Sequence, residues 1–296
     1  MVESVVEWVP DNVFAALSNG TLVQIIVFAI FFGIMITQMR KNSNAVDLVA
    51  MVVEGCNIIM QRMVEVIMTV APYGVFCLIA NLVGTTGVQN LKEIFSLVLT
   101  MWGGSLVHML VFLPLLLRLY GRVNPIKFFK NIVSVILMAF SIQSSAATLP
   151  VTMEVSKEKN GVPDDVVNLC AAPAATINMD GAAITITIMT LAAANTLGIQ
   201  VSLPAAIVLS AMSALGACGA SGVAGGSLLL IPMACSLFGI SNDVAMQMVG
   251  VGFIIGVVQD SVETALNSAG DVEFAATAEY HQWLKQGKPL PEFLHA

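Results

Sequence analysis

Charged side chains are scarce in this chain of 296 residues. They make up 10% of it, whereas a soluble domain typically carries about 25%. Hydrophobic residues make up 57%, so a soluble fold could not cover its surface with polar groups, and a soluble globular protein is excluded. Intrinsic disorder is excluded as well, because disordered chains combine low hydrophobicity with high net charge. The composition predicts an integral membrane protein.

Basic residues, histidine and cysteine are also few. Lys and Arg number 12 against 19 Asp and Glu, for a formal net charge of −7. We expect no nucleic-acid partner, because such a partner requires a basic surface. The five cysteines and three histidines stand singly, which predicts neither disulfides nor a metal cluster; they are Cys56, Cys77, Cys170, Cys218, Cys235, His108, His281 and His295.

The amino-terminal twenty residues show no secretory signal, because acidic residues and a proline interrupt the apolar run. Long apolar stretches further on predict membrane-spanning helices. The second stretch contains Glu54, Arg62 and Glu65 and breaks at Pro72, which suits a position lined by protein rather than by lipid. The predicted spans are 22–37, 46–83, 94–117, 166–194 and 244–266.

Two other apolar stretches favour re-entrant hairpins. In 132–153 the polar pair Ser144-Ser145 interrupts the run, and basic residues flank it on both sides. A full crossing would place positive loops on both membrane faces, against the positive-inside tendency, so we predict a hairpin shielded by protein. In 201–238 the glycine-rich segment GACGASGVAGG (216–226) cannot continue a helix comfortably and predicts a second hairpin.

The order of these segments is a weak internal repeat in reversed orientation. Each hairpin is followed by a helix with polar interruptions, the first broken at 178–181 and the second carrying carboxylates at 260–271. Inverted repeats with discontinuous helices are typical of secondary transporters, whose sites lie between the broken pieces.

Polar side chains recur along one face of the last predicted span. Asp260, Glu263, Thr264, Asn267 and Asp271 are offset by three, four, seven and eleven positions, so a helix places them together. Such a stripe must face a cavity or polar partners rather than lipid. It is either a ligand and ion path or a buried structural network.

The sequence NMDG (178–181) interrupts the preceding helix with an amide, a carboxylate and free backbone carbonyls. An oxygen-rich break without thiols suits a hard cation such as Na⁺. The alternative is a strained kink that Asp180 caps.

These motifs resemble those of a known family. SSAATLPVTM (144–153), NMDG (178–181), the glycine-rich hairpin and 260–267 are similar in order and spacing to the dicarboxylate/amino acid:cation symporter family, which has the glutamate-transporter fold. The resemblance runs from about residue 20 to 275, and the stretches 219–232 and 259–268 are most similar to its bacterial sodium-coupled serine/threonine symporters. It implies an all-α integral membrane fold with two re-entrant hairpins and discontinuous helices, in a homotrimer of the inner cell membrane.

The resemblance implies a substrate site. Asp260 would hold the α-amino group, with backbone carbonyls at Gln143 and Val223, while Ser145 and Asn267 would bind the α-carboxylate. The full implied set is Gln143, Ser144, Ser145, Ala182, Val223, Ser227, Asp260, Glu263, Thr264 and Asn267.

The resemblance also implies co-transported Na⁺. Side chains and backbone oxygens together would coordinate it. The implied ligands are Ala174, Thr176, Asn178, Asp180, Ala217, Cys218, Ala220, Asn267 and Asp271.

Two departures bear on the substrate. Family members that carry acidic amino acids have arginine at the position of Glu263 and threonine at that of Ala182. A carboxylate at 263 would repel a second substrate carboxylate, and 160–284 contains no Lys or Arg to neutralise one. A small neutral amino acid such as serine or threonine is therefore expected. Because Asp180 and the first-hairpin sequence are closer to the dicarboxylate branch, a sodium- or proton-coupled dicarboxylate or acidic amino acid symporter is the alternative.

The chain has no counterpart of the family's first three helices and part of the fourth, so a truncated, split or inactive form is a further alternative. The expected organisation is a partial scaffold of the trimerisation type over 1–122, a transport core over 123–275 and a cytoplasmic tail over 276–296.

An intramembrane protease is the rival from another class. GASG (219–222) satisfies a short serine-protease pattern around Ser221, with His108 in another span, and Asp180 with Asp260 could form an aspartyl pair. Four residues in a glycine-rich loop are a weak signal, so we expect no enzyme activity.

Overall fold

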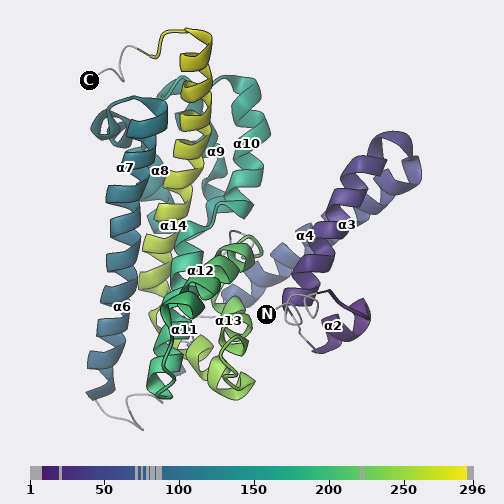
Figure 1. Cartoon of the computed structure of the whole chain (residues 1–296), viewed down its shortest axis with the longest axis vertical. Helices are drawn as coiled ribbons and strands as arrows, with labels where there is room; N and C mark the ends of the chain where they lie inside the picture. Colours follow the sequence, from purple (N-terminus) through teal and green to yellow (C-terminus); the bar gives the residue numbers. More distant parts are fainter. Residues whose placement is uncertain are drawn as a thin grey trace. The chain divides into compact units, whose positions relative to one another are not determined.

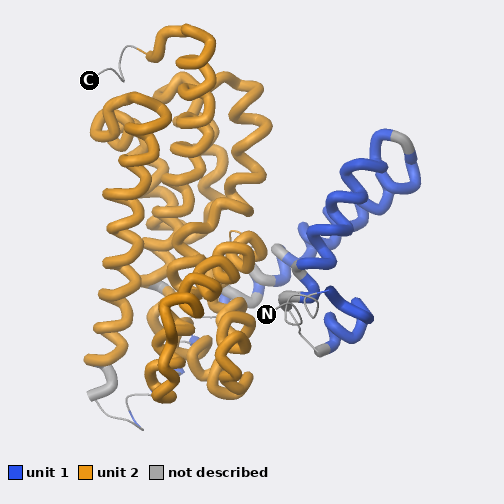
Figure 2. Tube along the Cα trace, in the orientation of Figure 1, with its two compact units in different colours: residues 1–85 blue, residues 86–296 orange. Residues whose placement is uncertain are grey.

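The computed structural model describes most of the chain as helix, and the described part contains no strand. By compactness the chain divides into two units, Met1–Thr85 and Thr86–Ala296 (Figure 2). The described residues are 9–19, 22–70, 73–74, 76–77, 80, 84, 89–220, 222 and 224–291.

The described part of the first unit contains the α-helices α2 (Val13–Asn19), α3 (Leu22–Met39) and α4 (Asn44–Met68), with a 3-10 turn (Arg40–Asn42) between the last two. An exposed ion pair between Arg40 Nε and Asp47 Oδ1, at 2.6 Å, joins the turn after α3 to the start of α4. Many apolar side chains of α3 and α4 are exposed in the single chain, as expected of helices that face lipid or other subunits. The predicted break at Pro72 lies outside the described residues.

The second unit begins with a long helical rod. It consists of α6 (Gln89–Val107), a π-helical segment (His108–Phe112), α7 (Leu113–Leu116) and a second π-helical segment (Leu117–Gly121). The rod packs against α11 and α14, which are described below. The sequence placed these residues in a scaffold ending at 122, whereas compactness groups them with the rest of the second unit.

Two helices joined by a tight turn follow, α8 (Pro125–Ile142) and α9 (Ser145–Glu158), and they pack side by side (Figure 1). Gln143 turns the chain with a left-handed φ of 58°. Ser144 then caps α9, since its Oγ accepts a hydrogen bond from the backbone N–H of Ala147. The turn therefore falls at the polar pair that the sequence singled out.

The next helix is broken in the middle. α10 (Asp164–Ile177) ends before Asn178, and α11 (Asp180–Thr196) begins two residues later. Asn178 and Met179 adopt non-helical backbone angles, and the regular helical hydrogen bonds of α10 end with the one from the Asn178 N–H to the Ala174 carbonyl.

A glycine-rich loop separates α12 (Leu203–Ala217) from a short 3-10 turn (Ser227–Leu230) and α13 (Ile231–Ser236). Gly222 and Gly225 both have positive φ, 62° and 74°, which L side chains rarely adopt. The glycines that the sequence analysis took as helix breakers are thus used for left-handed turns.

The last helix, α14 (Asn242–Gln286), bends by 83° between Asn242–Gly256 and Val258–Gln286. It is longer than the expected span over 244–266, and no tail separates at 276. Ala276 and Tyr280 are fully buried in the core, and the Tyr280 hydroxyl donates to the carbonyl of Asn160. This burial explains why the helix continues to Gln286.

Three described helical segments are long and apolar enough to cross a membrane: Lys92–Gly121, Pro125–Ile142 and Asp164–Thr196. The bent α14 would be a fourth. The expected first span falls on α3, of which Val27–Met39 forms a shorter apolar helix. The architecture is that of a multi-pass, all-helical membrane protein.

Two apolar clusters form the core of the second unit. Along α14, Ile255 belongs to one cluster and Leu266 to the other. Residues 259–264 lie between them, so the first part of the polar stripe of α14 sits at the boundary of the two clusters. This places the site at the middle of the unit.

Candidate functional site

The polar stripe of α14 is buried within the protein. Asp260, Glu263, Thr264, Asn267 and Asp271 are between 3% and 7% exposed. The polar partners found for this stripe come from the break before α11, from α11 itself, and from the glycine-rich loop with the 3-10 turn after it. The stripe therefore faces protein, as an intramembrane polar row must.

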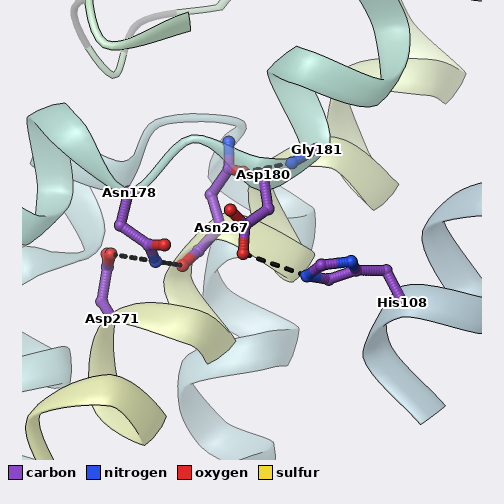
Figure 3. A network of polar contacts seen from close by, with 6 residues as sticks. All are labelled: His108, Asn178, Asp180, Gly181, Asn267 and Asp271. Carbon is purple, nitrogen blue, oxygen red and sulfur yellow. Dashed lines mark hydrogen bonds and ion pairs between the residues drawn. The ribbon is translucent and has the colours of Figure 1, made fainter. Parts of the chain in front are cut away.

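Asn178, Asn267 and Asp271 form one network at the break between α10 and α11 (Figure 3). The Asn178 Nδ2 group donates to the Asn267 backbone carbonyl at 3.1 Å and to Asp271 Oδ1 at 2.9 Å. Asn267 Oδ1 in turn accepts from the backbone N–H of Gly181 at 2.7 Å. The break thus brings together one carboxylate, two side-chain amides and a backbone carbonyl, joined by hydrogen bonds from N–H groups.

Two glycines permit this convergence. A Cβ on Gly181 would lie 2.7 Å from the backbone oxygen of Glu263, so the start of α11 touches the backbone of α14. A Cβ on Gly270 would lie 2.6 Å from Asn178 Nδ2. Because neither distance is possible for a real side chain, glycine at both positions lets Asn178 and Asp180 approach α14.

Asp180 has a partner that the sequence did not predict. His108, at the start of the first π-helical segment, lies with Nε2 3.1 Å from Asp180 Oδ2. Figure 3 shows Asp180 turned toward this ring, while the Asn178 network lies on its other side. The available signal was that His108 was the one histidine inside a predicted span.

Glu263 lies in a buried hydroxyl-lined position. Its Oε2 accepts hydrogen bonds from Thr185 Oγ1 at 2.6 Å and from Ser227 Oγ at 3.2 Å. Gln259 Nε2 also donates to Thr185 Oγ1, at 2.9 Å. Thr185 and Gln259 were missed by the sequence analysis; each lies on a helix face with a predicted residue, Thr185 three positions after Ala182 and Gln259 four before Glu263.

Asp260 binds the glycine-rich loop. Its Oδ2 accepts a hydrogen bond from the backbone N–H of Gly225 at 2.6 Å. The left-handed φ of Gly225 helps to aim this N–H at the carboxylate. Ser227 from the same segment reaches Glu263, so two consecutive turns of α14 are tied to one loop.

The turn of the first hairpin meets the glycine-rich loop. Ser144 Oγ donates to the carbonyl of Gly222 at 3.0 Å, and the backbone N–H of Ala146 reaches the same oxygen at 3.5 Å. On the α14 side, Gln143 Nε2 donates to Ser261 Oγ at 2.8 Å, and Ser268 Oγ lies 3.5 Å from Ser145 Oγ. Both hairpin ends therefore lie against the polar stripe.

The other residues of the implied substrate and cation sites lie outside the hydrogen-bond networks described above. Ala182 is fully buried and Thr264 nearly so. The carbonyls of Ala174 and Ala217 accept from the backbone of Asn178 and Ala220, and the Thr176 hydroxyl donates to the carbonyl of Pro173. Cys218 Sγ lies 3.5 Å from the carbonyl of Ile177. Val223, like Ser221 of the protease pattern, lies outside the described residues.

A cavity of about 550 Å³ reaches the break between α10 and α11. Most of its lining is apolar, but Asn178 and Asp180 contribute to the wall. A largely apolar cavity with a few polar groups is a common form of ligand or access site. The cavity shows that the break is reachable from the surface of the unit.

The site contains several carboxylates and no Lys or Arg. Asp180, Asp260, Glu263 and Asp271 lie close to the break and the loop, and no Lys or Arg is present in 160–284. Among the described residues no group of three His, Cys, Asp or Glu could hold a metal ion. Buried carboxylates with amide and hydroxyl oxygens, set at a helix break within the membrane, define a cation-coupled secondary transporter.

Comparison with known proteins gives the family. The model of the sodium:dicarboxylate symporter family matches residues 1–280. The serine/threonine transporter SstT of Bifidobacterium adolescentis is 49% identical over 303 aligned residues, which cover 100% of this chain and 68% of that protein. The chain belongs to the sodium:dicarboxylate symporter family, and the resemblance stated from its motifs is confirmed.

Family membership decides between the classes that the sequence left open. The protein is a symporter and not an enzyme, so the protease alternatives are excluded, and Na⁺ is the co-transported ion. It is a multi-pass membrane protein, in agreement with its apolar helices.

Proposed function

We propose that this protein imports a small neutral amino acid, serine or threonine, together with Na⁺ by alternating access. Support comes from a relative whose name is that of a serine/threonine transporter. The observation that carries the substrate class is Glu263, which faces Thr185 and Ser227 in a site without basic residues.

Glu263 favours a hydroxyl-bearing side chain. The Thr185 and Ser227 hydroxyls both donate to Oε2, which leaves Oε1 as the acceptor for a substrate hydroxyl. A substrate carboxylate at this place would face the carboxylates of Glu263 and Asp260 in a buried setting. Repulsion of several kcal/mol is expected for like charges at such a site.

The proposed substrate site follows from this arrangement. Asp260 binds the α-amino group, because a buried carboxylate is the natural partner of an ammonium. Ser145 and Asn267 bind the α-carboxylate, and Gln143 and Val223 add carbonyls. The remaining proposed contacts are Ser144, Ala182, Ser227, Glu263 and Thr264.

The proposed cation site uses the break and the neighbouring helix ends. Asn178, Asp180, Asn267 and Asp271 provide side-chain oxygens, an arrangement that suits a hard cation. Backbone oxygens complete the set, from Ala174, Thr176, Ala217, Cys218 and Ala220.

The two hairpins are proposed to be re-entrant, with the glycine-rich loop as the gate. The Gly225 amide on Asp260 and the Gly222 carbonyl on Ser144 are contacts that a closed gate would make. We propose a partial scaffold over 1–122, a transport core over 123–275 and a cytoplasmic segment over 276–296, whose first part continues α14 to Gln286. A homotrimer in the inner cell membrane completes the proposal.

Uptake into liposomes tests the function. The purified protein is reconstituted, and labelled serine, threonine and aspartate are followed with an inward sodium gradient, with equal sodium on both sides and with a proton gradient alone. Serine uptake driven by sodium is expected, with aspartate accumulating at least about tenfold less. Sodium- or proton-driven aspartate uptake above that of serine would instead establish the dicarboxylate alternative.

A further inference from the structure

His108 is a polar group that the proposed transport site does not use. It starts the π-helical segment after α6, an element that contributes no residue to the proposed substrate or cation sites. Its ring stacks on Phe112, with centroids 5.6 Å apart and an interplanar angle of 13°. π-Helical segments often occur at functional positions, because the extra residue re-aims a side chain.

The ring of His108 holds the carboxylate of Asp180. Nε2 lies 3.1 Å from Asp180 Oδ2, and the two side chains are 27% and 29% exposed. A carboxylate only accepts hydrogen bonds, so Nε2 is the protonated nitrogen that donates. Among the described residues, no other side chain is recorded within hydrogen-bonding distance of the Asp180 carboxylate.

The neighbouring hydrogen-bond network of Asn178, Asn267 and Asp271 does not include Asp180. Asn178 donates to both Asn267 and Asp271, and Asn267 accepts from the Gly181 backbone. Asp180 is the second carboxylate of the proposed cation site, yet it points toward the rod that contains His108 (Figure 3). His108 engages Oδ2 alone, so a cation bound by both carboxylates must either share the Asp180 carboxylate with His108 or draw it away from the ring.

We propose that His108 is a positioning residue that competes with Na⁺ for Asp180. It holds the carboxylate toward the α6 rod while the cation cluster is empty, and Na⁺ binding releases it. His108 thereby raises the sodium concentration that half-saturates the transporter. This inference rests on the proposed cation site at Asn178, Asp180, Asn267 and Asp271.

Three variants isolate the effect. His108→Phe removes the donor but retains a ring to stack on Phe112, and His108→Gln retains a donor. His281→Phe is the matched control, because His281 contacts the carbonyl of Tyr120 far along the sequence from the site. Size-exclusion profiles and thermal unfolding in detergent establish that each variant is folded.

Two readouts are used: direct Na⁺ binding to purified protein by titration with NaCl, and the sodium dependence of serine uptake. His108→Phe is expected to lower the half-saturating sodium concentration about threefold to tenfold, the worth of one ordinary hydrogen bond, because the pair is partly exposed. His108→Gln and His281→Phe are expected to stay within about twofold of the parent. The half-saturating serine concentration at saturating sodium is expected to be unchanged.

A second comparison separates competition from a structural role. In an Asp180→Ala background, which removes the acceptor for His108, His108→Phe is expected to leave Na⁺ binding unchanged, because the contact for which Na⁺ competes is already lost. An unchanged or raised half-saturating sodium concentration for His108→Phe in the parent background would overturn the proposal. Failure of the parent protein to bind Na⁺ at all would instead overturn the proposed cation site itself.

Discussion

The carboxylate of Asp260 accepts a hydrogen bond from the backbone N–H of Gly225 at 2.6 Å. This contact joins α14 to the glycine-rich loop and places one of the few buried charges of the chain at the loop. An ammonium group that binds Asp260 therefore shares this carboxylate with the loop, so its binding depends on where the loop lies. The contact links substrate binding to gate closure in the proposed mechanism.

Asp260→Asn tests the amine-binding role. The asparagine Oδ1 can still accept from Gly225, so the fold is expected to persist, whereas the charge that binds the ammonium is lost. Serine uptake is expected to fall about 100-fold or more, as measured in liposomes. Asp165→Asn, an exposed residue of α10, is the control and should transport normally. Undiminished uptake by Asp260→Asn would remove the proposed role.

Glu263→Arg combined with Ala182→Thr tests the substrate class. An arginine at this place can pair with a substrate side-chain carboxylate in a bidentate manner, and the threonine reproduces the pattern of acidic-substrate carriers. Aspartate is expected to displace labelled serine from the double variant but not from the parent. Glu158→Arg, at an exposed position of α9, should keep the parental preference. A double variant that still prefers serine would contradict the substrate logic.

Gly270→Ala tests the cation cluster. The new Cβ would lie 2.6 Å from Asn178 Nδ2, so the Asn178 side chain must move away from Asp271. The half-saturating sodium concentration is expected to rise at least about tenfold, because one proposed ligand is displaced. Gly250→Ala on the same helix meets nothing within 4 Å and should leave sodium dependence unchanged. Equal sodium dependence of the two variants would show that Asn178 is no cation ligand.

Tyr280→Phe tests the extension of α14 beyond the predicted span. The Tyr280 hydroxyl donates to the carbonyl of Asn160, and the ring is fully buried. Removal of the hydroxyl is expected to lower the free energy of unfolding by about 1–2 kcal/mol, as measured by denaturation in detergent. The transport kinetics are expected to stay unchanged. Tyr120→Phe, at an exposed ring, should have no effect on stability. If Tyr120→Phe lowered the free energy of unfolding and Tyr280→Phe did not, the result would contradict the observed packing of Tyr280.

Local patterns were sufficient for the break and the turns. The Asn178-Met179 interruption and the turn before Ser145 fall where the sequence placed them. Both depend on residues whose backbone preferences act within a few positions, such as Ser144 as a helix cap. The burial of the stripe on α14 likewise follows from helical periodicity, because exposure of five polar groups to lipid would be costly.

The partners of these residues were not predictable. His108 and Asp180 are separated by 72 positions, and Thr185 and Gln259 by 74. No local preference encodes such a pair, because the contact depends on how two helices pack. The bend of 83° in α14 and the continuation of the helix to Gln286 were also missed, since burial of Tyr280 against distant segments stabilises that part.

The resemblance of its motifs to a known family implied a symporter. The amino-acid sequence alone determined that the protein is an all-helical membrane protein, and it determined which residues are polar at membrane depth. Composition and periodicity suffice for this because water-free surroundings tolerate few polar groups and few backbone forms. Tertiary structure alone decided that Asp180 turns to His108, that Glu263 faces two hydroxyls and that Asp260 binds the loop. These choices depend on close packing between segments far apart in the chain, where a shift of one ångström makes or breaks a hydrogen bond.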